Sequence, residues 1–199
     1  MDKLPRLPWA LGLWVEVIDL DKHLDDLMSL EQACFPESMR ESHASLAELF
    51  EEHGLVGLIL YSKGRPIATL SGVKASLNNI PSEAMLDQLA GFGRVFYMEN
   101  ICVHPDYRSA ENLLFMFQEM KLRISPYFDC VSGAARVSNG WSQKLQAAFR
   151  AKVLGRFEDW QGFCEPFEFV VIDLSRVPVS PAWIRRLQLL LGKIARIRF

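Results

Sequence analysis

The stretch that most constrains the fold is 95–124, where an apolar run leads through a Pro-Asp turn into a helical pattern. Val95–Val103 is apolar at nearly every position, which is typical of a central strand buried on both faces of a sheet. From 109 to 124 the apolar residues recur at helical spacing. A strand expected at 128–134 completes a strand–helix–strand unit. Such a unit predicts two parallel strands joined by a right-handed crossover.

The other periodic segments predict antiparallel strands and helices around this unit. The expected helices are 21–34, 42 or 45 to 52, 81–90 and 139–153. The expected strands are 14–19, 55–61, 66–75, 157–160 and 167–174. Together the elements predict an α/β fold in which a mixed sheet with a central parallel unit has helices on both faces.

Charge is unevenly distributed along the chain. The net charge is −2, but segment 176–199 holds six of the 22 Lys and Arg residues and none of the 24 acidic ones. On a helical wheel its apolar residues gather on one arc and most of its basic residues lie opposite. We therefore expect a domain at 1–175 and a basic amphipathic helix at 176–199. Packing on the acidic body, a homodimer contact and an anionic membrane surface at 181–199 all suit such a helix.

Cysteine and histidine spacing argues against a metal site and a disulfide framework. Cys34, Cys102, Cys130 and Cys164 form no C-x-x-C pair, and the four histidines show no H-x-x-x-H spacing. We expect reduced, mostly buried thiols and a cytoplasmic protein. No apolar run approaches the roughly 18 residues that cross a bilayer. Aromatic residues do not interleave a basic patch, so nucleic acid is not an expected partner.

Four local motifs occur in an order known from one family. The segment 30–36 reads LEQACFP, like a first helix that runs into an aromatic-Pro turn. The segment 100–108 reads NICVHPDYR, like a fourth strand with a V-x-P-x-Y-R exit. Asn139 opens a helix, and 154–157 reads LGRF, like the turn that follows it. Over about residues 14–174 the chain resembles the GNAT N-acetyltransferase superfamily.

The resemblance implies transfer of an acetyl or other acyl group from coenzyme A to an amine of a small molecule or protein. The central strands would part after Val103, and the pantetheine arm would hydrogen-bond to the backbone of Ile101, Cys102 and Val103. The pyrophosphate would lie at the next helix N-terminus, where free amides and the helix dipole favour anions. The residues implied there are Arg108, Ser109, Ala110, Glu111, Asn112 and Leu113. Asn139 would either bond the pantetheine arm or cap its own helix.

The phosphate segment departs from the family pattern. Members usually read R-x-x-G-x-G or R-x-x-G-x-A, but Glu111 and Leu113 stand at the glycine positions here. Glycine lets bare backbone approach a phosphate closely, and a carboxylate about 6 Å from a phosphate charge repels it by roughly 3 kcal/mol. Two alternatives therefore stay open: a donor other than acetyl-CoA, such as an acyl chain on a carrier protein, and a non-catalytic GNAT-fold binding or regulatory module.

Glu99 is the candidate general base. It lies near where related enzymes carry a glutamate, inside an apolar strand where desolvation would raise its pKa towards a useful value. The alternative is a carboxylate that faces solvent or pairs with Arg94 or Arg136.

The general acid is not identified by the sequence. Many relatives carry N-x-x-A-x-x-L-Y with the tyrosine beside the sulfur, and Gln146 occupies that position here. Tyr97, Tyr107, His104 and water are the substitutes, with His104 expected to be solvated. Cys102 is expected to be packed rather than to act as a nucleophile.

Overall fold

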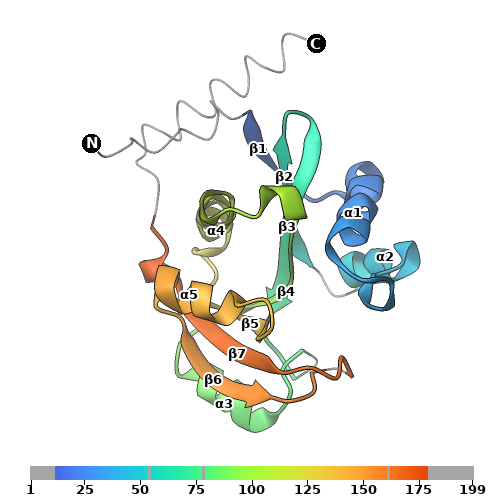
Figure 1. Cartoon of the computed structure of the whole chain (residues 1–199). Coiled ribbons are helices and arrows are strands. Elements are labelled where there is room, and N and C mark those ends of the chain that lie inside the picture. The colour runs from blue at the N-terminus through green and yellow to red at the C-terminus, as the bar shows by residue number, and fades with distance from the viewer. Residues whose placement is uncertain (1–11, 53–54, 78, 161, 179–199) are drawn as a thin grey trace. The chain divides into compact units, whose positions relative to one another are not determined.

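The computed structural model describes residues 12–178, apart from 53–54, 78 and 161 (Figure 1). The helices are α1 (Leu20–Cys34), α2 (His43–Glu52), α3 (Glu83–Ala90), α4 (Ala110–Ile124) and α5 (Trp141–Phe149). The strands are β1 (Leu13–Val17), β2 (Val56–Ser62), β3 (Arg65–Lys74), β4 (Val95–Val103), β5 (Cys130–Arg136), β6 (Lys152–Phe157) and β7 (Phe167–Asp173). Segment 179–199 lies outside the described residues, so the amphipathic helix and its contacts remain predictions.

The strands form a seven-stranded mixed sheet in the order β1-β2-β3-β4-β5-β7-β6. β4 and β5 are parallel, whereas β1 and β2, β5 and β7, and β6 and β7 are antiparallel. The predicted α/β fold with a central parallel strand–helix–strand unit is therefore confirmed. None of the described helices is long and apolar enough to cross a membrane.

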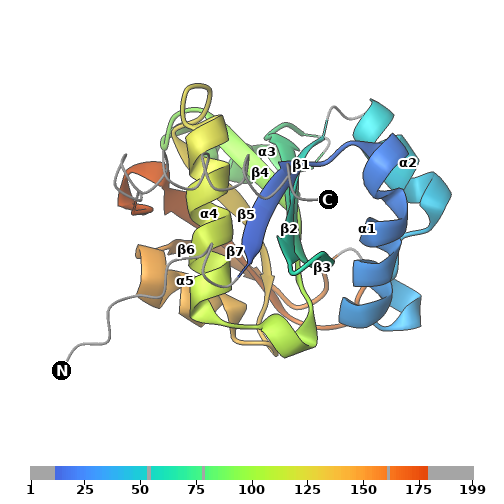
Figure 2. The ribbon, with the colours of Figure 1, turned by 90° about the horizontal axis from the view of Figure 1, so that it is seen from above.

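Contacts divide the described chain into two compact units. Unit 1 contains the described parts of 1–70 and 101–120. In unit 1, α1 and α2 cover one face of β1 and β2, and α4 lies on the other face (Figure 2). The covered face is apolar, because Leu27 and Leu30 of α1 and Leu46 of α2 pack with Ile59 and Tyr61 of β2.

Unit 2 contains the described parts of 71–100 and 121–178. Its framework is β5, which pairs with β7 along its whole length from Cys130 to Arg136. Aromatic side chains fill its core: Trp160 contacts the rings of Phe157, Phe167 and Phe169. Helix α5 packs on β5 and β7.

The sequence prediction was wrong between Arg150 and Trp160. The helix expected to reach Val153 ends at Phe149, because Arg150 adopts a left-handed conformation with φ 53°. Residues Lys152–Phe157 instead form β6, which pairs with β7 and carries a register shift between Val153 and Gly155. The LGRF motif therefore lies in an irregular strand rather than a turn.

Candidate active site

The pairing and burial of β4 change halfway along its length. Its register pairs with β5 join Val95, Phe96 and Tyr97 to 130–132 and end there. Residues 95–98 are all buried, Glu99 is exposed, and burial returns only at Cys102. We call 95–98 the paired half and 99–103 the open half. The parting of the strands was expected after Val103, but the register pairs of β4 with β5 already end at Tyr97, so the expected position was too late.

Glu99 is the first residue of the open half. It is exposed, yet the protein around its carboxylate removes enough water to raise its pKa to about 7. The two arginines considered as partners are engaged elsewhere. Arg94 makes two bonds of 3.0 Å to Asp129, and Arg136 Nε lies 2.9 Å from a Glu165 oxygen. A carboxyl group with a pKa of about 7 can either donate or accept a proton near neutral pH.

Tyr97 lies two residues before Glu99 in the same strand. Its ring is buried and stacked on Phe169, with the ring centroids 6.1 Å apart. Burial, and then the charge of Glu99, raise the pKa of this phenol well above its ordinary value. Tyr97 therefore stays protonated through the neutral range.

The other candidate acids have structural bonds. His104 Nδ1 accepts the Asp106 amide at 3.3 Å, and its imidazole meets the Tyr107 ring edge-on at 5.6 Å. Gln146 donates through Nε2 to the Ser142 hydroxyl at 3.1 Å. Each of these side chains is therefore held by a contact within its own turn or helix.

The N-terminus of α4 retains only part of the predicted phosphate site. Ser109 Oγ accepts the Asn112 amide at 3.1 Å, and the Leu113 amide donates to Ser109 O at 3.2 Å. The Ser109 amide itself donates to Tyr107 O. The amides of Ser109, Asn112 and Leu113 therefore already have acceptors within the chain.

Arg108 is held at the end of β4. Its Nε donates to Val103 O at 3.1 Å, and its positive charge acts on the nearby Cys34 thiol. The Val103 carbonyl therefore already accepts one hydrogen bond within the chain. Cys102 is 2% exposed and packed, as predicted.

Asn139 lies just before the N-terminus of α5, whose N-cap is Gly140 and has no side-chain capping bond. Asn139 Oδ1 accepts the Trp141 amide at 2.9 Å, and Gly140 between them has φ 66°. Asn139 therefore makes a local turn bond, and the prediction that it caps the helix was wrong by one residue. Its contact with a pantetheine arm remains a prediction.

The predicted site residues fall in both units. Ile101 to Val103 and Arg108 to Leu113 belong to unit 1, whereas Glu99 and Asn139 belong to unit 2. Glu99 and Ile101 are linked directly because both lie in β4. The described residues contain no group of three or more His, Cys, Asp or Glu side chains arranged to hold a metal ion.

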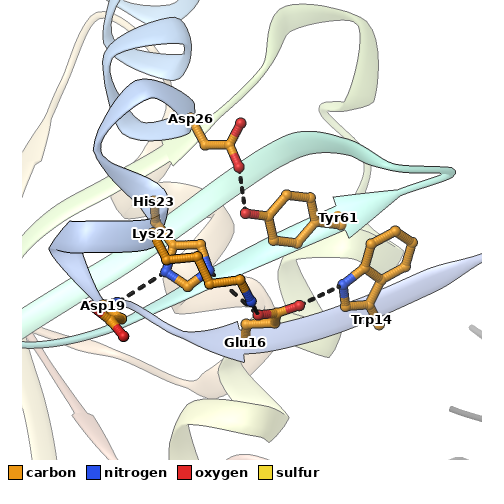
Figure 3. A network of polar contacts seen from close by, with 7 residues as sticks. All are labelled: Trp14, Glu16, Asp19, Lys22, His23, Asp26 and Tyr61. Atoms are coloured by element: carbon orange, nitrogen blue, oxygen red, sulfur yellow. Dashed lines mark hydrogen bonds and ion pairs between the residues drawn. The ribbon is translucent and has the colours of Figure 1, made fainter. Parts of the chain in front are cut away.

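A second group of titratable side chains joins β1, α1 and β2 in unit 1 (Figure 3). Glu16 accepts from the Trp14 indole at 3.2 Å and pairs with Lys22, and His23 Nε2 lies 3.3 Å from it. The Asp19 amide donates to His23 Nδ1 at 2.9 Å. Neutral His23 therefore carries its proton on Nε2, facing Glu16.

This group has the features of a structural cluster. Burial opposes ionisation of Glu16, but the bonds and charge of Lys22 outweigh it and lower the pKa of Glu16. Tyr61 donates to Asp26, and burial followed by that bond raises the pKa of Tyr61. The sequence did not indicate this group because its members follow no known motif and Tyr61 is distant from the others in the chain.

A scan against protein-family models finds no match, and a search of curated protein sequences finds none either. Solved structures do match. The ribosomal-protein-S18-alanine N-acetyltransferase from Escherichia coli aligns with TM-score 0.58 at 12% identity, over 85% of this chain and 97% of that one. FeeM, an N-acyl amino acid synthase from uncultured soil microbes, aligns with TM-score 0.64 at 9% identity, over 83% and 92%.

The third match shows that this fold hosts more than one chemistry. GphF, a GNAT-like decarboxylase in complex with isobutyryl-CoA, aligns with TM-score 0.54 at 18% identity, over 81% of this chain and 99% of that one. All three matches cover most of both chains, and the resemblance inferred from the sequence motifs points to the same architecture. The chain has the fold of the GNAT superfamily.

Proposed function

We propose that the chain is an N-acyltransferase that moves an acetyl or other acyl group from coenzyme A to an amine. The observation that carries the proposal is Glu99, a carboxylate with a pKa of about 7 at the first position of the open half of β4. A base with this pKa is about half deprotonated at neutral pH and can accept a proton from an amine. The acetyltransferase and synthase of the same fold support the reaction class.

In the proposed reaction, Glu99 takes a proton from the acceptor amine, directly or through one water. Coenzyme A, when bound, supplies the acyl thioester and leaves as a thiolate. Protonated Glu99 can then return the proton, since a pKa of about 7 lies below the roughly 8.5 of a thiol. Tyr97 is unsuited to this step, because its raised pKa opposes proton release. A separate tyrosine acid at position 146 is then not required.

The backbone around α4 fits coenzyme A only in part. The residues that would hold it are the backbone of Ile101 and Cys102 and the amides of Ala110 and Glu111. The Asn112 amide and the Val103 carbonyl already have partners within the chain. Because the Ser109 and Asn112 amides are already bonded, this helix N-terminus offers fewer donors to a pyrophosphate than the family pattern implies.

This partial fit favours a second candidate within the same reaction class, an acyl chain on a carrier protein. A carrier presents its chain on a phosphopantetheine arm, which has one phosphodiester instead of a pyrophosphate. The Glu111 carboxylate then opposes one phosphate charge rather than two. The acceptor remains an amine in both candidates.

Calorimetry distinguishes the donors. The full chain is titrated with acetyl-CoA, a long-chain acyl-CoA and an acyl carrier protein that bears the same long chain. Tighter binding of the carrier supports the second candidate, and tighter binding of either coenzyme A ester supports the first. If none binds at about millimolar concentration, roughly −4 kcal/mol, acyl transfer is contradicted and a non-catalytic module is left.

Turnover tests the base. With the donor that binds and a panel of amines, Glu99→Gln should lower kcat/KM by about 100-fold or more. The wild-type rate should rise with pH through about 7, and the variant should lack this rise. Glu158→Gln is the matched control, because its exposed carboxylate pairs with Arg156 on the surface of the same unit. Unchanged turnover in Glu99→Gln would show that the assigned base is wrong.

A further inference from the structure

Two of the four cysteines meet in unit 1 although they are distant in the sequence. Cys34 is the last residue of α1, and Cys102 is the penultimate residue of β4. Their side chains pack in the same apolar cluster, and the two thiols interact electrostatically. Cys102 Sγ also lies 3.6 Å from Leu30 O, one turn before Cys34 on the same helix. Both side chains belong to the apolar layer between α1 and the sheet.

We propose that Cys34 and Cys102 form a reversible disulfide on reaction with a hydroperoxide, so that this pair is an oxidative modification site. The packing of both side chains in one cluster, with Cys102 Sγ near the Leu30 carbonyl one turn before Cys34, carries the proposal. The positive charge of Arg108 near Cys34 supports it. It stands independently of acyl transfer. The two side chains pack where the end of α1 meets β4, and a disulfide requires this kind of proximity.

The pair is chemically asymmetric. Cys34 is partly exposed, and its bond with Cys102 followed by the charge of Arg108 lowers its pKa in spite of burial and of Glu31. Cys102 is 2% exposed, and its contact with Cys34 together with burial raises its pKa. Cys34 is therefore the thiolate that meets the oxidant, and Cys102 is the thiol that resolves it.

The reaction balances with one hydroperoxide. The Cys34 sulfur attacks the O–O bond, so that an S–O bond forms and the departing oxygen leaves as water or an alcohol after protonation. Cys102 then gives up its proton and its sulfur attacks the Cys34 sulfenic acid. An S–S bond forms, the S–O bond breaks and water leaves. The two thiols lose two electrons in total, and the hydroperoxide gains them.

The other two cysteines provide internal references. Cys130 is buried, and burial with the charges of Asp129 and Asp173 raises its pKa to about 11. Cys164 is exposed, with its sulfur 3.7 Å from Gly162 O. Within the described part of the chain, neither has a second thiol or a cation in contact. Exposure alone would favour Cys164, whereas the proposal favours Cys34.

The test is peroxide treatment of the reduced full chain, followed by alkylation, proteolysis and mass spectrometry. We expect a peptide linked through Cys34 and Cys102, which dithiothreitol reverses, while Cys130 remains reduced. Cys34 should react roughly tenfold faster than Cys164. Absence of the linked peptide, or faster oxidation of Cys164, would overturn the proposal.

Variants separate the two steps. Cys102→Ala should stop the reaction at a Cys34 sulfenic acid, which a dione reagent traps. Cys34→Ser, at the more exposed position, keeps the buried Cys102 in place and should abolish the linked peptide. Arg108→Met should slow oxidation of Cys34 by about tenfold and leave the rate at Cys164 unchanged. Equal slowing at both cysteines, or none, would contradict the role of Arg108. Circular dichroism checks that each variant folds.

Discussion

The two halves of β4 belong to one continuous strand but meet different surroundings. In the paired half, 95–98, every residue is buried and the strand runs parallel to β5. In the open half, Glu99 is exposed and Asn100 and Ile101 are only partly covered. The enclosed half contributes to stability, and the open half leaves polar groups of the same strand uncovered. One strand therefore provides both the core and the candidate site.

Glycines on the neighbouring strands show how closely the paired half is enclosed. An ideal Cβ at Gly72 of β3 would lie 2.2 Å from Tyr97 O and 2.6 Å from the Phe96 ring. A Cβ at Gly133 of β5 would lie 3.1 Å from Met98 O. Backbone therefore approaches backbone on both sides of the paired half. The two halves of β4 therefore differ mainly in packing and, to a smaller extent, in charge.

The largest expected effect is loss of the close approach at the paired half. Gly72→Ala forces β3 and β4 apart, because the added carbon would overlap a backbone oxygen that cannot rotate away. We expect a loss of about 3 kcal/mol in the free energy of unfolding, measured by urea denaturation. Gly133→Ala is the graded control, with a smaller loss of about 1 kcal/mol. Equal and small losses would mean that the paired half is less enclosed than described.

Glu99→Gln should change stability in a pH-dependent way. The pKa of Glu99 is about 7 in the folded chain and lies above the ordinary value of 4.5, so the folded state binds the proton more tightly. Wild-type stability therefore falls as pH rises from about 4.5 to 7. The variant should be more stable at pH 8 by about 1 kcal/mol, a figure reduced for solvent screening, and unchanged at pH 4. Thermal unfolding across this range measures the difference.

Glu16→Gln is the control of opposite sign. Its pKa is lowered, so its contribution is present above about 4.5 and is lost as pH falls through the folded-state value. The variant should be less stable than wild type at pH 8 by somewhat less than 1 kcal/mol and similar at low pH. If both variants shifted stability in the same direction, the assigned surroundings of one carboxylate would be wrong.

The sequence predicted the elements of β4 and α4 because each has an undivided local pattern. The apolar run at Val95–Val103 predicts a buried strand, and the helical spacing of apolar residues in Ala110–Ile124 predicts a helix. Between Arg150 and Phe157 the sequence pattern gave a wrong prediction of helix. Apolar residues continue there at helical spacing, and no glycine marks the left-handed turn at Arg150. Tertiary pairing with β7 decided that segment.

The sequence predicted properties of single residues in the candidate site, but not how those residues are arranged. The raised pKa of Glu99 followed from its apolar strand and agrees with the structure. The point where β4 separates from β5 could not be predicted, because it depends on long-range pairing between the two strands. The packing of Cys34 near Cys102 also joins residues that are distant in the sequence. Local sequence patterns showed only that each of the two cysteines has apolar neighbours.

The smallest expected effect lies at the boundary between the halves. Ser132 is directly opposite Tyr97, the last paired residue, and its buried hydroxyl has no hydrogen-bond partner among the described residues. A buried hydroxyl without a partner is costly, and Ser132→Ala removes it at the expense of a small cavity. We expect a gain of about 0.5 kcal/mol in the free energy of unfolding, with unchanged affinity for the donor. A loss of stability would contradict the absence of a hydrogen-bond partner for the Ser132 hydroxyl. A loss of donor affinity would place Ser132 in the ligand site. The boundary of the open half would then move by one residue pair towards the N-terminus of β4.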